Sequence, residues 1–96
     1  MPREASEIES RLGRLLTAIQ SEEMRALGSA DWSATHAALV RAESLYWAAK
    51  RSMLEAALAG RAVRAYLGAE WLSRHPRVLP AIQDLEHHLR DFAHQD

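Results

Sequence analysis

Cysteine is absent from the sequence, which excludes disulfides, zinc–thiolate sites and thiol nucleophiles together. Long apolar runs are also absent, since none approaches the roughly 20 residues of a membrane span. The first seven residues are charged and lack the apolar stretch of a signal peptide. We therefore expect a cytoplasmic protein that does not contact a membrane.

Aromatic residues are scarce, with one Phe, two Tyr and three Trp among 96 residues. Alanine and leucine supply much of the 48% hydrophobic share, and both favour helices over sheets. A chain of this length has room for one core. The composition therefore predicts an all-α fold that forms a single domain over residues 1–96.

Charge is distributed unevenly along the chain, although the net charge is only −1. Residues 1–31 carry a balance of −2, residues 32–77 a balance of +4, and residues 78–96 a balance of −3. A basic middle between acidic ends can pair with itself in the fold or form one basic face. The sequence leaves both possibilities open.

Two long helices are predicted in the first 59 residues. Ser6 and Glu9 form a capping-box pattern, and apolar residues at steps of three and four then predict a helix over 6–27 that Gly28 ends. No Gly or Pro interrupts residues 32–59, so we expect a second helix of about 28 residues and about 42 Å. The short connection makes the pair an antiparallel hairpin over 6–59. The expected inner face of the second helix contains Trp32, Leu39, Val40, Tyr46, Trp47, Met53, Leu54 and Leu58.

Shorter helices are predicted after Gly60. One or two lie within 61–75, divided by Gly68, and a last one over 80–94 begins at Pro80. The hairpin is too long for one short helix to cover its apolar face. Either residues 61–94 fold back along it, or a second chain covers it, and a homodimer or a permanent partner is the natural remedy.

Charged residues recur within the expected apolar faces. In a hairpin that turns at 28–31, Glu23 faces His36 and Glu9 faces Lys50, while Glu43 faces Leu16. One interpretation is a buried polar network of Glu23, His36, Glu43 and Lys50 that fixes the register of the helices. The other is a metal site of ferritin-like type, which needs Glu-x-x-His pairs that these helices lack.

The C-terminal histidines offer a second possible metal site. Asp84 and His88, like Asp91 and His94, have helical spacings that could ligate a transition metal weakly. A solvated surface is the simpler interpretation, so we expect no bound metal and no cofactor. Gly-rich phosphate loops and Gly-x-Ser-x-Gly turns are missing as well. We therefore expect no catalytic residues and no enzymatic activity.

Residues 61–80 combine arginine with aromatic side chains, a mixture that suits protein hot spots or stacking on nucleic acid. Alternatively, the aromatic residues cap the open end of the hairpin while the arginines stay in solvent. The expected partner-binding residues are Arg61, Arg64, Tyr66, Leu67, Trp71, Leu72, Arg74 and Arg77.

The stretch 19–34, IQSEEMRALGSADWSA, resembles the hairpin turn of flagellar type III export chaperones. In that family a helix that ends in Met, Leu and Ala meets a Gly-Asp-Trp-like turn and a second long amphipathic helix. Here Ser29 and Ala30 separate Gly28 from Asp31, and Thr35 and His36 stand where leucines are expected. The resemblance covers about residues 8–58. It implies a helical chaperone that holds an export substrate or regulator through its C-terminal helix.

Three functions are compatible with the sequence. The first is a non-enzymatic helical module, a chaperone or adaptor that covers an apolar helix of a partner protein, itself a homodimer. The second is a small nucleic-acid-associated or regulatory subunit that uses the basic segment 61–77. The third is a metal-binding helical bundle.

Overall fold

The computed structural model describes residues 3–93 and the side chains of residues 7–90. The fold is all-α, as predicted, and no strand occurs between residues 3 and 93. The elements are α1 (Arg3–Ala26), α2 (Trp32–Lys50), α3 (Leu54–Leu58), α4 (Val63–Leu67), α5 (Ala69–Arg74), the 3-10 turn η1 (Pro76–Val78) and α6 (Leu79–Ala93).

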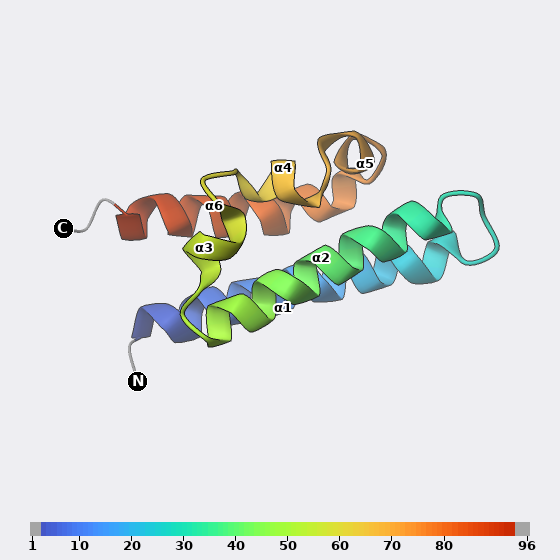
Figure 1. Ribbon diagram of the computed structural model, residues 1–96. Helices are drawn as coiled ribbons and strands as arrows, with labels where there is room; N and C mark the ends of the chain where they lie inside the picture. The colour runs from blue at the N-terminus through green and yellow to red at the C-terminus, as the bar shows by residue number, and fades with distance from the viewer. Residues whose placement is uncertain (1–2, 94–96) are drawn as a thin grey trace.

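Helices α1 and α2 form the predicted antiparallel hairpin (Figure 1). Gly28 ends α1 with a φ of 79°, a left-handed conformation that glycine adopts without strain. The Ser29 N–H then donates to the Ala26 carbonyl at 2.9 Å. The helix begins at Arg3, so Ser6 lies inside its first turn and is not the cap that the sequence pattern predicted.

The second helix is shorter than predicted, because it ends at Lys50 and does not continue to residue 59. Ser52 has a φ of 58°, its N–H donates to Ala49, and the Met53 N–H donates to Ala48 at 2.7 Å. This is the Schellman arrangement, which satisfies the last carbonyls of a helix through one left-handed residue. Neither Gly nor Pro marks the break, and α3 follows it in a new direction (Figure 1).

The predicted inner face of α2 is also wrong in part. Val40 and Trp47 are exposed, and Met53, just beyond the helix, is exposed as well. Alanines occupy much of the true inner face, and their small side chains let α1 approach closely. The buried residues of α2 are Thr35, Ala38, Leu39, Ala42, Leu45 and Ala49.

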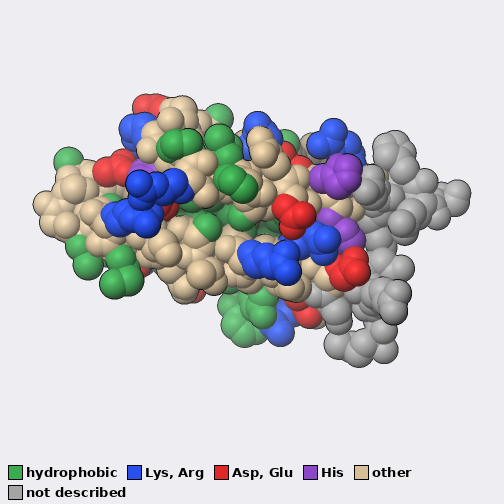
Figure 2. Space-filling model, turned by 180° about the vertical axis from the view of Figure 1, so that it is seen from behind, with side chains coloured by type: hydrophobic (Ala, Val, Ile, Leu, Met, Phe, Trp, Pro, Cys, Tyr) green, Lys and Arg blue, Asp and Glu red, His purple; other side chains and the backbone are tan. Residues whose placement is uncertain are grey.

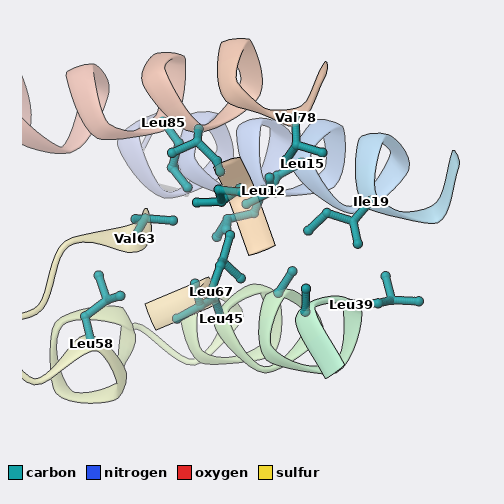
Figure 3. Packing of buried hydrophobic residues seen from close by; sticks show 14 of the residues in the cluster. Leu12, Leu15, Ile19, Leu39, Leu45, Leu58, Val63, Leu67, Val78 and Leu85 are labelled. Carbon is teal, nitrogen blue, oxygen red and sulfur yellow. The ribbon is translucent and has the colours of Figure 1, made fainter. Parts of the chain in front are cut away.

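The last third of the chain folds back along the hairpin. Helix α6 begins at Leu79, next to the predicted Pro80, and packs against α1 (Figure 1). Leu85 and Val78 point toward Leu12 and Leu15 of α1 (Figure 3). One core cluster draws residues from every element: Leu12, Leu15, Ile19, Ala38, Leu39, Ala42, Leu45, Ala49, Leu54, Leu58, Val63, Leu67, Trp71, Leu72, Val78, Ile82 and Leu85. Of the two ways to cover the hairpin that the sequence left open, the first is present: residues 61–93 fold back along it.

The start of α1 and the end of α6 lie at one end of the molecule, and the α1–α2 turn and α5 lie at the other (Figure 1). None of the described helices combines the length and the apolar character that a membrane span requires.

Candidate functional site

The aromatic and aliphatic residues predicted to bind a partner are mostly buried. Leu67, Trp71 and Leu72 belong to the core, and Tyr66 is half-buried. The Trp71 indole N–H donates to the Thr35 hydroxyl at 3.0 Å, which ties α5 to α2. Leu67, Trp71 and Leu72, which were predicted to bind a partner, are therefore core residues. Trp71 lies near the turn of the hairpin and not at its open end.

The arginines of the same segment are largely engaged within the chain. Arg64 pairs with Glu86 through two nitrogens, the closest at 2.7 Å. Arg74 contacts both Asp31 and Glu70. The remaining two differ: the Arg61 guanidinium lies over the Tyr66 ring, whereas Arg77 is exposed.

These contacts match the first of the two charge interpretations, in which the basic middle pairs with the acidic ends. Figure 2 shows acidic and basic side chains interspersed on one face of the molecule, without a continuous basic surface. On that face the described residues do not form the continuous basic groove that a nucleic-acid backbone requires.

The predicted buried network of Glu23, His36, Glu43 and Lys50 is not buried. His36, Glu43 and Lys50 are exposed, and only Glu23 is half-buried. His36 does contact Glu23 across the hairpin, with Nδ1 and Oε2 2.7 Å apart, and its ring stacks on Trp32. Lys50 lies over the Tyr46 ring and not against Glu9. Glu23, His36, Glu43 and Lys50 therefore lie on the surface of the hairpin.

A buried polar cluster, which the sequence did not reveal, lies where α5 meets the hairpin turn. Nδ1 of His75 is 2.7 Å from Oε1 of Glu22, and its Nε2 is 2.5 Å from Oδ2 of Asp31. The His75 ring also stacks on Trp71, with ring centres 4.4 Å apart. Both ring nitrogens of His75 therefore face carboxylate oxygens, one on α1 and one in the hairpin turn.

Hydrogen bonds hold the two carboxyls of this cluster in the charged form. Burial opposes ionisation of Glu22, but hydrogen bonds from His75 and Arg25 outweigh it, so the pKa of Glu22 lies below its ordinary value. The pKa of Asp31 is also lowered, mainly by its hydrogen bond from His75 and also by those from Arg74 and Thr35. The cluster is an ionic clamp that joins α1, the hairpin turn and the end of α5.

An exposed apolar face on α2 and α3 is the second feature that the sequence did not reveal. Val40, Trp47 and Met53 are 46%, 55% and 55% exposed. Val40 and Trp47 are separated by two helical turns, so they share one face of α2. Beside Trp47 the break after α2 leaves a groove lined by Ser44, Trp47, Ala48, Arg51, Met53, Ala56 and Ala57. Arg51 is the single charged residue of that lining.

Metal ligands do not converge in the described part of the chain, where no three His, Asp or Glu side chains are placed to hold an ion. His88 lies against α1, with Nε2 3.7 Å from a Glu7 oxygen, and Asp84 contacts Arg11. The predicted pairing of Asp91 with His94 lies outside the described side chains.

No family model, curated protein or solved structure matches the chain. The resemblance to flagellar export chaperones therefore stays a prediction.

Proposed function

We propose that the chain is a non-enzymatic helical protein-binding module, a chaperone or adaptor that holds an amphipathic helix on the outer face of α2. The observation that carries the proposal is the alignment of Val40, Trp47 and Met53, three large apolar side chains that are all exposed on one side of the molecule. The cytoplasmic location expected from the composition is part of the same proposal.

The character of α2 supports a covered outer face. Helices α1 and α6 are strongly amphipathic, with one apolar stripe turned to the core, whereas α2 carries apolar residues on opposite sides. The inner side of α2 meets α1, so its outer side is the one that still lacks a cover.

The kind of occupant follows from the shape and charge of this surface. Trp47 stands beside a groove, and tryptophan next to a pocket is a frequent hot spot in protein interfaces. Because Arg51 is the only charge in the groove lining, a carboxylate beside the apolar stripe of the partner helix would complement it. An amphipathic helix with acidic flanks meets both requirements.

This binding mode differs from the one that the chaperone resemblance implies. There the C-terminal helix is expected to hold the substrate. Here Ile82 and Leu85 of α6 are fully buried against the hairpin, so the apolar side of this helix is already occupied. The outer face of α2 is the better candidate, and no observation favours nucleic acid or a metal ion in its place.

A library of helical peptides displayed on phage tests the proposal. Peptides selected on the wild-type protein should share an apolar stripe at i, i+3, i+4 and i+7 with adjacent acidic residues. Their affinity for a Trp47→Ala variant should fall by about 30-fold, as for an anchor worth about 2 kcal/mol.

Trp32→Ala is the matched control, because Trp32 is also partly exposed on α2 but lies outside the groove. Its affinity for the selected peptides should stay within about threefold of the wild-type value. Failure to enrich helical peptides, or equal binding by the Trp47→Ala variant, would contradict the proposed function.

A further inference from the structure

We infer that the helix held on this face is α2 of a second copy of the chain, paired antiparallel across a twofold axis. The inference rests on the proposed function, because it names the occupant of the same surface. The outer side of α2 carries two exposed apolar side chains, Val40 and Trp47, and two exposed charges of opposite sign, Glu43 and Lys50, lie together on one flank beside them. A second copy is then the resident occupant, and a partner helix would have to displace it.

A specific register brings the apolar side chains of the two copies together. In an antiparallel pair, residues that face each other have numbers with a constant sum. A sum of 93 centres the pair between Tyr46 and Trp47 of α2. The two Trp47 side chains then meet close to the axis. Because a twofold interface is self-complementary, each contact between different residues occurs twice, whereas the contact between the two Trp47 side chains occurs once, at the axis.

The charges beside the stripe select the same register. Glu43 and Lys50 occupy one flank of α2, one heptad apart, and both are exposed. A twofold axis perpendicular to the helices places the same flank of both copies side by side. With a sum of 93, each Glu43 faces Lys50 of the other copy. With a sum of 86, which centres the pair on Glu43, the two carboxylates face each other and repel.

Neither charge has a competing ion partner in the described part of one chain. Glu43 forms no ion pair with a described residue, and Lys50 contacts only the ring of Tyr46. Exposed ion pairs contribute little energy, so the apolar contacts supply the affinity and the Glu43–Lys50 pairs fix the register. The same division holds between the core and flanking positions of coiled coils.

Sedimentation equilibrium of the full chain and its charge variants tests this pairing. The wild-type protein should sediment at twice 10.8 kDa. Glu43→Lys and Lys50→Glu should each raise the dimer dissociation constant by more than about tenfold, because each places like charges opposite one another. The double variant Glu43→Lys/Lys50→Glu should return to within about threefold of the wild-type constant, because it restores the two pairs in reverse.

A second pair of variants separates the face from general effects on folding. Trp47→Glu should give a folded monomer, whereas Met24→Glu, at another exposed apolar residue outside the face, should remain a dimer. A wild-type chain that sediments as a monomer at every attainable concentration overturns the inference. So does a double variant whose dimer dissociation constant is no lower than those of the two single variants. If the chain is a monomer while selected peptides still depend on Trp47, self-pairing is wrong and the proposed function stands. If the chain is a monomer and no helical peptide binds, both are wrong.

Discussion

Two histidine–glutamate pairs in this protein have the same geometry and different burial. His75 lies 2.7 Å from Glu22 with side-chain exposures of 11% and 9%, and His36 lies 2.7 Å from Glu23 with exposures of 49% and 23%. The same substitution at each histidine therefore isolates the effect of burial. We predict that His75→Gln is strongly destabilising and that His36→Gln is nearly neutral.

The magnitude follows from what each substitution leaves behind. Breaking a buried charged pair costs about 3–5 kcal/mol. Arg25 remains on Glu22, and Asp31 keeps Arg74 and Thr35, so we expect about 2 kcal/mol for His75→Gln. That loss corresponds to a fall in Tm of about 8–16 °C for a domain of this size. His36→Gln should cost less than about 0.5 kcal/mol, as for other exposed pairs.

The pH dependence of stability gives a second measure of the clamp. The folded pKa values of Glu22 and Asp31 are depressed. Their stabilising contribution is therefore fully present above the unfolded values, about 4, and is lost as the pH falls through the folded ones. The wild-type protein should lose more stability than His75→Gln on acidification from pH 6 to about pH 3.

Urea denaturation followed by circular dichroism, at pH 7 and through the acid range, measures both effects. His36→Gln should follow the wild-type curve at each pH. Equal losses for the two histidine variants at pH 7, or parallel acid curves for wild type and His75→Gln, would refute the clamp.

Two further predictions concern the helix break and the buried indole. Ser52→Gly should raise the free energy of unfolding by about 0.5–1 kcal/mol, because residue 52 has a left-handed backbone conformation that glycine adopts without strain. Ser44→Gly, inside α2, should lower it by a similar amount. The Tm values of the two variants should therefore shift in opposite directions in thermal melts. Thr35→Val keeps the volume of the side chain but removes both the acceptor of the Trp71 N–H and the hydroxyl that donates to Asp31, and should cost about 1–3 kcal/mol in urea denaturation. Thr17→Val at an exposed position should stay within about 0.5 kcal/mol, and equal effects of the two threonine variants would show that the Trp71 hydrogen bond contributes nothing.

The hairpin and the last helix could be predicted from the sequence because local signals mark them. Gly28 ends α1, Pro80 lies next to the start of α6, and the apolar stripes of both helices have a clear period. The break at Ser52 could not be predicted, because serine rarely adopts the left-handed conformation and no other signal accompanies it.

The candidate sites were harder to predict, because they depend on which side of a helix is buried. Apolar residues surround α2, so its period did not distinguish the alanine side, which meets α1, from the side of Val40 and Trp47. The same ambiguity applies to α1, where the sequence pattern favoured Glu23 as the buried acid. The acid that is buried is Glu22, which lies about 100° away from Glu23 around the helix. The contact of Glu22 with His75 joins residues 53 positions apart, and no local pattern encodes such a pair.

The position of α6 at the end of the chain has a consequence for folding during synthesis. The hairpin is complete once Lys50 has been made, but Val78 and Leu85, which cover Leu12 and Leu15, come later. At about 5–20 residues per second, the 35 residues from Arg51 to Leu85 take about 2–7 seconds to translate. Isolated helices form in about a microsecond. The helices of the nascent hairpin therefore form while Leu12 and Leu15 are still uncovered. During those seconds these leucines are the part of the chain that general chaperones of the ribosome exit are best placed to bind.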